Sequence, residues 1–458
     1  MSFVDLVWEP AFHVRLGFGS TISRSEDGAS FVLKNAHGSL PVGPYTPGFE
    51  AGNALLIEGA PLAGLRDAVL RSGGAHGAGA YMLWLQGLCD RLGVIEFALV
   101  DEAGECAVIL PQWEAFVPAL APQAPAEEVR LDRFACLRRE GEAWLLESPL
   151  AGCRFGLDEL GALDTPLVRR ALDASGFLAS TGGETGPRRR ALAQWEFHDL
   201  LFHMRHRRGW HRDSFGAAYP FIGEIEPLPA ARPSWSGERI ALDRAPDAAG
   251  AEPFASVLER RRSERVYDLS RPLGLRDLGA LLDRAARIRS FDSFPVANWL
   301  GHSTRFEVTR RPYPNGGASY ELEIYPVVDR CNGLASGLYH YDAEAHALVR
   351  ISGRTSAVEA LVAGARIATV GEADPQVVLA IAARFARVTW KYRSIAYAVI
   401  LRNAGVLYQT LYLAATELGL SPCGIGSGDA AVFARATGLD PVIEGTVGDF
   451  ILGGPPRR

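Results

Sequence analysis

The stretch 397-YAVILRNAGVLYQTLYLAATELGLSPCGIG-426 decides how the second half of the chain is interpreted. Apolar side chains recur through residues 397–418 at the spacing of one helix face, and Gly419 stands where the pattern stops. This predicts a long apolar helix over 397–418. The glycine-rich loop 420-LSPCGIGSGD-429 follows. It lacks the lysine of a Walker A motif and follows a helix, so it is neither a P-loop nor a Rossmann fingerprint.

The residues on both sides of this stretch, from 254 onward, have the pattern of an α/β domain. The turn and strand of 312-PYPNGGASYELEIYPVV-328 form its strongest strand signal. Helices are predicted at 254–267, 275–287, 355–364 and 374–384, and strands at 304–309, within 338–351 as a hairpin, and at 444–452.

The first part of the chain has the order of a winged helix. A hairpin is predicted over 11–34, helices at 60–71 and 80–92, and a strand pair over 94–109. Residues 130–178 repeat this order in shortened form. The helix at 80–92 has one arginine and one aspartate among apolar side chains, whereas a DNA-reading helix is basic. The pattern therefore favours contact with a protein or peptide over DNA.

Three segments rich in proline or glycine, 114–128, 180–190 and 223–253, divide the chain. We therefore predict an α+β protein with four parts: a winged-helix-like domain at 1–118, a shortened second one at 126–182, a connecting arm with a short helix at 191–253, and the main domain at 254–458.

Composition excludes several classes of protein. The net charge of −6 implies no attraction to nucleic acid or an anionic membrane. Six scattered cysteines without a CxxC pair fit a reducing cytosol better than a disulfide framework or a zinc ribbon. No apolar run reaches the ~18 residues of a spanning helix, and the N-terminus has no signal-peptide pattern. The sequence predicts a cytoplasmic protein without membrane or nucleic-acid partners.

Lysine is almost absent from the chain. The 47 basic residues include only Lys34 and Lys391, and Lys391 lies beside Tyr392 in 388-VTWKYRSIAY-397. Arginine stays protonated in proteins, whereas a desolvated lysine can lose its proton. Lys391 is therefore a candidate for proton transfer, and an exposed lysine without a role is the alternative.

Two further motifs have weaker meanings when taken alone. Guanidinium groups in 260-RRRSER-265 match phosphate oxygens, although a basic run at a helix end is usually a solvated face. Two glycines in 314-PNGGAS-319 allow a close approach of backbone to a planar ligand, although the same residues suit an ordinary turn.

Together, the order of these motifs resembles the nitroreductase-like flavoproteins, and specifically their SagB-type branch, the FMN-dependent azoline dehydrogenases that include the cyanobactin oxidases. The resemblance rests on the RRRSER run, the PNGGAS turn, the Lys-Tyr pair, the long helix and the CGIG loop, and it extends over about 195–458. It implies a central mixed sheet surrounded by helices. The N-terminal pattern resembles the peptide-clamp modules of some cyanobactin oxidases.

The resemblance implies a role for each motif. Lys391 and Tyr392 would be the catalytic pair. FMN would be bound by the basic segment, by the proline–glycine turn, by the long helix, by the glycine loop and by a terminal arginine: Arg261, Arg262, Ser263 and Arg265; Pro314, Asn315, Gly316 and Gly317; Gln409; Cys423, Gly424, Ile425 and Gly426; and Arg457. Two residues depart from the pattern of this superfamily. Asn403 stands where an acidic residue is common, and Asn315 replaces the usual serine.

The chemistry explains the need for a base. Aromatising a thiazoline or oxazoline removes a hydride, which FMN accepts, and a ring proton, which needs a base with a pKa near the working pH. Trp390 and Tyr397 would desolvate Lys391 for this purpose. The expected partners are an azoline-containing precursor peptide, a cyclodehydratase, molecular oxygen as electron acceptor, and a second copy of the chain in a homodimer.

Two other functions remain open from the sequence. One is a small-molecule nitroreductase or quinone reductase that uses NAD(P)H. The other is a peptide-binding scaffold with a vestigial flavin site. His198, His203, His206 and His211 do not all share one helix face, so no metal site is predicted.

Overall fold

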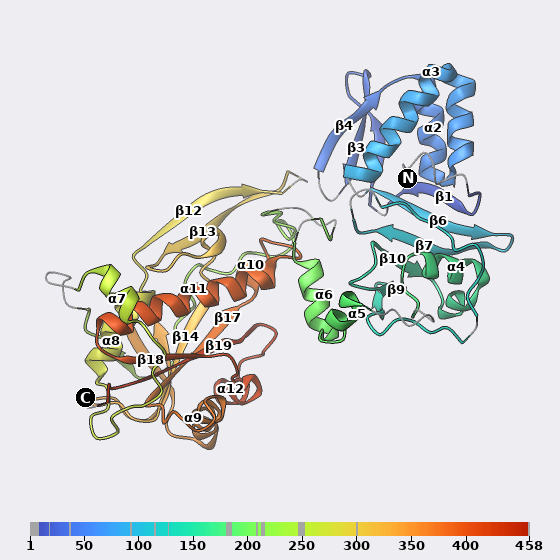
Figure 1. Ribbon diagram of the computed structural model, residues 1–458. Coiled ribbons are helices and arrows are strands. Elements are labelled where there is room, and N and C mark those ends of the chain that lie inside the picture. The colour runs from blue at the N-terminus through green and yellow to red at the C-terminus, as the bar shows by residue number, and fades with distance from the viewer. Residues whose placement is uncertain are drawn as a thin grey trace. The chain divides into compact units, whose positions relative to one another are not determined.

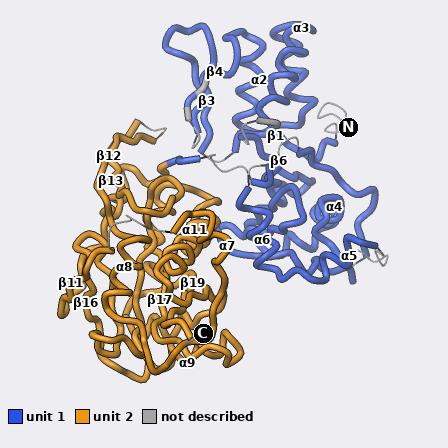
Figure 2. Tube along the Cα trace, turned by 60° about the vertical axis from the view of Figure 1, so that its left-hand side comes forward, with its two compact units in different colours: residues 1–218 blue, residues 219–458 orange. Residues whose placement is uncertain are grey.

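The computed structural model describes residues 9–17, 19–35, 38–91, 94–113, 116–126, 128–179, 186–207, 209–211, 216–245, 252–298 and 301–456. The chain divides into two compact units, residues 1–218 and 219–458 (Figure 2). Each unit has its own sheet and its own hydrophobic core. All six cysteines are free thiols. Within the described ranges, no helix has the length and apolarity that crossing a membrane requires.

Unit 1 is built on a seven-stranded antiparallel sheet (Figure 1). Its strand order is β5-β1-β6-β7-β10-β9-β8, and a smaller sheet has the order β2-β3-β4. The strands of the large sheet are β1 (Phe12–Leu16), β5 (Ala60–Pro61), β6 (Ile95–Asp101), β7 (Gly104–Pro111), β8 (Cys136–Glu140), β9 (Ala143–Glu147) and β10 (Cys153–Leu157), and those of the small sheet are β2 (Thr21–Arg24), β3 (Ser30–Asn35) and β4 (Gly38–Pro44).

The helices of unit 1 lie where the chain leaves these strands. Helix α3 contains a kink at Gly74, whose φ of 68° a glycine adopts at no steric cost. Helix α4 begins at Pro166 behind the capping side chain of Thr165, which accepts a hydrogen bond from the Val168 N–H. The helices are α2 (Pro47–Glu58), α3 (Leu62–Arg91), the 3₁₀ helix η1 (Leu160–Asp164), α4 (Pro166–Ala174), α5 (Pro187–Leu192) and α6 (Phe197–Arg205).

The two predicted N-terminal domains share one sheet and one core. Strand β10 pairs with β7, with Phe155 opposite Ile109, and Phe97 and Phe155 belong to the same buried cluster. The division between compact units falls after residue 218, which lies inside the predicted arm 191–253. The predicted strand pair over 94–109 is present, and the two predicted helices lie in α3 on either side of the Gly74 kink. The hairpin predicted over 11–34 was partly wrong, because β2 pairs with β3 whereas β1 pairs with β5 and β6. Helix α2 and strands β4 and β10 were not predicted. The order of elements does not confirm the winged-helix interpretation.

Unit 2 has a second seven-stranded sheet, in the order β11-β16-β15-β14-β17-β19-β18. Strands β14 and β17 lie at its centre and are buried along their whole length. The strands are β11 (Arg239–Ala241), β14 (Leu322–Val328), β15 (Gly337–Asp342), β16 (Ala347–Ser352), β17 (Val377–Arg384), β18 (Ser421–Ile425) and β19 (Glu444–Gly453), and a separate hairpin consists of β12 (Ser290–Ala297) and β13 (Ser303–Arg310).

Helices cover both faces of this sheet (Figure 1). Apolar side chains of α8 and α11 form one core with Ile324 and Leu379, and side chains of α9 and α12 form another with Tyr325 and Ala380. Successive strand residues thus face opposite cores, as the pleat requires. The helices are α7 (Phe254–Arg260), α8 (Leu275–Ala286), the 3₁₀ helix η2 (Gly316–Ala318), α9 (Ser356–Ala368), α10 (Ala386–Thr389), α11 (Ala396–Glu417) and α12 (Ala430–Thr437).

Three predictions for this unit were wrong in detail. The segment 374–384 is the strand β17, because a strand buried on both faces lacks the alternation that identifies a strand. Helix α7 ends at Arg260, the first residue of the basic cluster, because Arg261 leaves helical geometry at ψ 124°. The sheet was predicted to be mixed, yet every described pairing in it is antiparallel. Strands β18 and β19, for example, are antiparallel neighbours, because α12 between them returns the chain to the end of the sheet at which β18 finishes.

Candidate active site

Lys391 lies in the short link between α10 and α11. Its Nζ donates a hydrogen bond of 2.9 Å to the carbonyl oxygen of Gly317, and the residue is only 5% exposed. Four aromatic rings have their centroids within 6 Å of the amine: Phe306 at 5.1 Å, Tyr392 at 5.5 Å, Phe294 at 5.7 Å and Tyr219 at 5.8 Å. The amine is therefore held away from water, against a backbone carbonyl.

This environment lowers the pKa of Lys391 to about 8, chiefly because burial disfavours the ammonium and secondly because the Arg387 cation repels it. The predicted causes of desolvation were partly wrong. Tyr397 is 47% exposed and contacts Phe385. Trp390 contributes to the desolvation only indirectly. Its ring stacks on the ring of Phe306 at an interplanar angle of 6°, and the Phe306 ring faces the amine.

Tyr392 and Lys391 converge on Gly317. A Cβ built on Gly317 would lie 2.2 Å from the Tyr392 hydroxyl and 2.8 Å from Lys391 Nζ, and Gly317 has a φ of +65°. Only glycine fits this position without displacing both side chains. Gly317 itself is exposed, so the pair lies beside a surface that a ligand can reach. Burial, and then the charge of Glu321, raise the pKa of Tyr392, which keeps its hydroxyl protonated.

The proline–glycine turn is fixed by a buried polar cluster. Asn403 Oδ1 accepts a hydrogen bond of 2.9 Å from the Gly316 N–H. The side-chain amides of Asn403 and Asn315 donate to the two oxygens of Glu321, at 2.9 and 3.0 Å. The two departures from the superfamily pattern therefore contact the same carboxylate. Pro314, at the start of the turn, is exposed.

The serine of the basic segment and Gly424 meet at a second place. The glycine-rich segment predicted to be a loop is a strand over Ser421–Ile425, which is β18. The hydroxyls of Ser263 and Tyr412 are 2.8 Å apart, and Tyr412 Oη accepts a hydrogen bond of 2.7 Å from the Gly424 N–H. The guanidinium of Arg261 lies over the Tyr412 ring, 5.3 Å from its centroid. Residues 261, 263 and 424 are thus brought together on the C-terminal part of α11.

The remaining predicted cofactor residues are less closely gathered. Arg262 pairs with Glu264, and Arg265 pairs with Glu372 at 3.3 Å. Of the loop and helix residues, Cys423 and Ile425 are buried, whereas Gln409 and Gly426 are exposed. Arg457 lies outside the described residues.

These residues suit an anionic, planar cofactor. The ion pairs of Arg262 and Arg265 are exposed, so they contribute little to stability. Each guanidinium group can therefore exchange its carboxylate partner for a phosphate. Gly426 has open space where a Cβ would stand, which allows a flat ring to approach the backbone. The turn at Asn403 and the loop at Tyr412 are nine residues apart on α11, or about 14 Å along the helix axis. An elongated cofactor spans such a distance.

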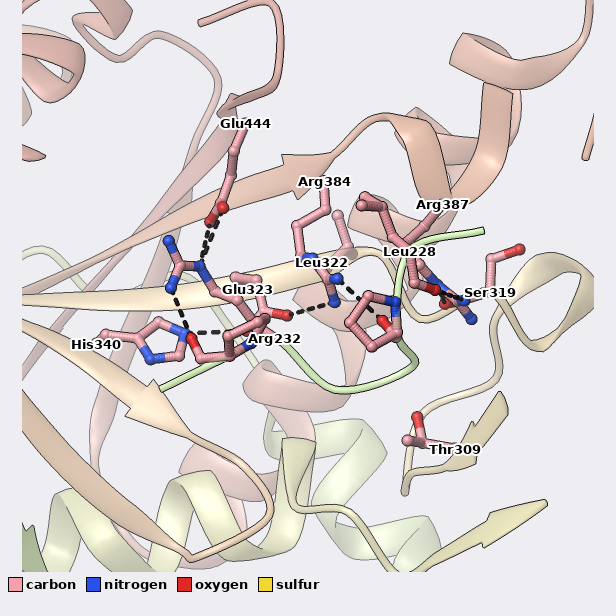
Figure 3. Close-up of polar contacts among 12 residues, drawn as sticks. Leu228, Arg232, Thr309, Ser319, Leu322, Glu323, His340, Arg384, Arg387 and Glu444 are labelled. Atoms are coloured by element: carbon pink, nitrogen blue, oxygen red, sulfur yellow. Dashed lines mark hydrogen bonds and ion pairs between the residues drawn. The ribbon is translucent and has the colours of Figure 1, made fainter. Parts of the chain in front are cut away.

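Figure 3 shows a buried polar network that no sequence motif predicted. Arg387 donates to the carbonyl oxygens of Ser319 (3.0 Å), Leu228 (2.7 Å) and Glu307 (2.8 Å), and thereby joins the turn, the arm and β13. Arg387 lies on α10, four residues before Lys391 in sequence, and burial lowers the pKa of its guanidinium to about 10. The spacing of four residues, one helical turn, is the only sequence signal that linked it to Lys391.

The same network fastens the extended arm that begins unit 2. Arg384 donates to the Pro229 carbonyl at 2.9 Å and lies 3.7 Å from Glu323, while Arg232 pairs with Glu444 at 3.0 Å (Figure 3). These contacts fix the arm, and Tyr219 at its start covers the Lys391 amine. Among the described residues, no group of three or more His, Cys, Asp or Glu side chains is placed to hold a metal ion.

Comparison with known proteins identifies two regions. Residues 258–453 match the nitroreductase family, and residues 161–212 match the family described as "Cyanobactin oxidase ThcOx". The protein named Putative nitroreductase MJ1384, from Methanocaldococcus jannaschii, is 33% identical over 171 residues, which make up 37% of this chain and 77% of that protein. The Trifolitoxin-processing protein TfxB of Rhizobium leguminosarum is 30% identical over 149 residues, 32% of this chain and 40% of that protein.

A crystal structure of a putative nitroreductase from Ralstonia eutropha aligns with 51% of this chain and 99% of its own, at 21% identity and a TM-score of 0.37. The family matches confirm the predicted resemblance to SagB-type, nitroreductase-like oxidases and the α+β fold of the second unit. The chain belongs to the nitroreductase family.

Proposed function

We propose that the protein is an FMN-dependent dehydrogenase that oxidises thiazolines or oxazolines in a ribosomally made peptide to thiazoles or oxazoles. The observation that supports this most is the buried amine of Lys391, with its pKa lowered to about 8, beside Tyr392 and the exposed Gly317. Reduction of a nitro group by a flavin requires no base of this kind. The likeness of 161–212 to cyanobactin oxidases supports a peptide substrate.

The residues that would hold FMN lie in two groups. Arg261, Arg262, Ser263 and Arg265 would bind its phosphate and ribityl chain, because guanidinium forks and a hydroxyl match phosphate oxygens. Backbone N–H groups of residues 423–426, at the end of β18, and of the 315–317 turn would line its ring. When bound, FMN supplies the two-electron acceptor that takes a hydride from the azoline carbon.

The chain's own residues would handle the proton. At a pH above about 8 the Lys391 amine is largely neutral, and its lone pair would accept the proton from one ring carbon as the adjacent ring carbon loses hydride, so that a double bond forms between the two carbons. The Gly317 carbonyl, which accepts a hydrogen bond from Nζ, orients the amine. The Tyr392 hydroxyl, which stays protonated, would accept a hydrogen bond from the ammonium that Lys391 becomes. The rings of Tyr219, Phe294 and Phe306 exclude water and so keep the amine a base at moderate pH.

The proposal extends to partners. An azoline-containing precursor peptide would be the substrate, a cyclodehydratase would form its rings, molecular oxygen would accept the electrons from the reduced cofactor, and a second copy of the chain would complete a homodimer.

The test uses an azoline peptide and the FMN-loaded protein. We expect each ring to lose the mass of two hydrogen atoms, and Lys391→Ala to abolish the loss while its flavin absorbance is unchanged. Lys34→Ala, which removes the chain's other lysine from an exposed position on β3, is the matched control and should be active. Unchanged peptide mass, with steady NAD(P)H-dependent reduction of a nitroaromatic or quinone, would favour a small-molecule reductase instead.

A further inference from the structure

Glu321 is a fully buried carboxylate beside the candidate site. It is 0% exposed and precedes β14. Its Oε1 accepts a hydrogen bond from Asn403 on α11, and its Oε2 accepts one from Asn315 in the turn. A carboxylate in the interior requires such donors. Burial raises the pKa of Glu321, and the two amide donors and the Arg311 charge oppose that rise. The ionised carboxylate can only accept, so both amide NH₂ groups point toward it, and this fixes the orientation of both carboxamides.

The oxygen of each carboxamide binds the backbone of the turn. Asn403 Oδ1 accepts from the Gly316 N–H and Asn315 Oδ1 accepts from the Tyr320 N–H, both at 2.9 Å. The turn needs this support, because Ala318 and Tyr320 have φ values of 53° and 44°. Non-glycine residues persist in such conformations only where their surroundings determine them. One carboxylate thus fixes, through two amides, the backbone on both sides of Gly317.

We propose that Glu321 is a positioning residue. Its carboxylate, acting through Asn315 and Asn403, holds the Gly317 carbonyl where that carbonyl accepts the hydrogen bond from the Lys391 amine. This inference rests on the proposed function, in which that amine is the base. Nothing in the mechanism brings Glu321 into contact with substrate or cofactor.

The charge of Glu321 has a second effect. It raises the pKa of Tyr392, whereas Lys391 is influenced mainly by burial and by Arg387. The other ionisable groups that face Glu321 are Arg311, Arg387 and Tyr313. Removing the charge should therefore lower the pH at which Tyr392 ionises and leave the titration of Lys391 nearly in place.

The decisive variants exchange the carboxylate and one amide. Glu321→Gln leaves an NH₂ group facing an NH₂ group, and Asn403→Asp leaves two carboxylates at hydrogen-bond distance. The double variant Glu321→Gln/Asn403→Asp restores one donor and one acceptor, with the Gly316 N–H still paired. We expect each single variant to lower ring oxidation at least ~10-fold with FMN bound, because small misplacements of reacting groups are costly, and the double variant to recover most of the loss. In Glu321→Gln, Tyr392 should ionise at a lower pH than in the wild type. The alkaline decrease in the ring-oxidation rate should therefore begin at a lower pH in this variant.

A second readout needs no turnover. The two lysines make amine labelling site-specific by peptide mass, so the labelling rate of Lys391 can be compared with that of Lys34 in the FMN-loaded protein. Glu321→Gln should raise the rate at Lys391, and the double variant should restore it. Glu323→Gln is the control: it alters another buried carboxylate, which binds His340 at 3.0 Å, and should lower the melting temperature without changing Lys391 labelling.

Three results would overturn the inference. The first is a Glu321→Gln protein whose rates of ring oxidation and of Lys391 labelling equal those of the wild type. The second is a double variant that loses as much oxidation rate as the two single variants together. The third is a Lys391 labelling rate that is the same in Glu321→Gln and Glu323→Gln. A wild-type protein that oxidises no ring refutes the proposed function alone, since the labelling comparison still tests the role of Glu321.

Discussion

The amine of Lys391 and the carbonyl of Gly317 form a hydrogen bond of 2.9 Å between segments 74 residues apart in sequence. The contact joins the link before α11 to the turn before β14. It places a desolvated amine at an exposed glycine, where a substrate can approach.

Lys391 should make the stability of the fold depend on pH. Its pKa falls from 10.5 to about 8 on folding, so the unfolded chain binds more protons between these values and stability rises with pH there. Below pH 8 the buried ammonium costs up to about 3 kcal/mol. Lys391→Met removes this cost, so its melting temperature should exceed that of the wild type at pH 7, and the difference should shrink by pH 10. A constant difference across this range would contradict the lowered pKa.

Gly317→Ala should inactivate the protein without unfolding it. The added Cβ would overlap the Tyr392 hydroxyl and press on the Lys391 amine. Ring oxidation should fall ~100-fold while FMN stays bound. Gly371→Ala is a matched control, because Gly371 has a φ of +78° and open space around its Cβ position. It should cost about 1 kcal/mol of stability and no activity. Equal activity in the two variants would show that the convergence on Gly317 is unimportant.

The ring of Tyr219 should help to set the pKa of Lys391. The ring covers the amine, and the Tyr219 N–H donates a hydrogen bond of 3.2 Å to the Lys391 carbonyl. Tyr219→Ala admits water, so the pH midpoint of the oxidation rate should move up from about 8 toward the ordinary lysine value. Tyr219→Phe retains the ring and should keep the wild-type midpoint. Identical profiles for the two variants would rule out a role of the ring in desolvation.

Tyr412 should support cofactor binding. Its hydroxyl bridges Ser263 and the Gly424 N–H. Removing it in Tyr412→Phe loosens the basic segment from Gly424, and the loss of two hydrogen bonds worth about 1 kcal/mol each should weaken FMN binding by up to ~30-fold. Fluorescence titration of the apoprotein with FMN gives the dissociation constant. Tyr339→Phe, whose hydroxyl binds the Ala335 carbonyl, is the control. Equal FMN dissociation constants in Tyr412→Phe and Tyr339→Phe would show that FMN does not bind beside Tyr412.

Local signals in the sequence were sufficient for the long helix and for the candidate base. Helix α11 was predicted because its apolar residues recur on one face and Gly419 ends it. Lys391 was identified by its rarity in an arginine-rich chain, and its burial agrees with the predicted desolvation.

The rest of the site depends on contacts that no local pattern records. Glu321 and Asn403 are 82 residues apart, and Arg387 reaches carbonyls of Leu228 and Glu307 on other segments. The strand β17 was mistaken for a helix because a continuous apolar run fits both when each face is buried. Tertiary burial, which the sequence does not display, decided these features.

The most direct test of the central claim is the pH dependence of a single turnover with an azoline peptide and the FMN-loaded protein. The account predicts a rate that rises with pH through a midpoint near 8, as Lys391 loses its proton. In Lys391→Ala the rate should be lower by ~100-fold or more, with the midpoint abolished. A rate that does not change between pH 6 and 10, roughly two units on each side of the midpoint, would contradict the account. A Lys391→Ala protein that oxidises the ring as fast as the wild type would contradict it as well.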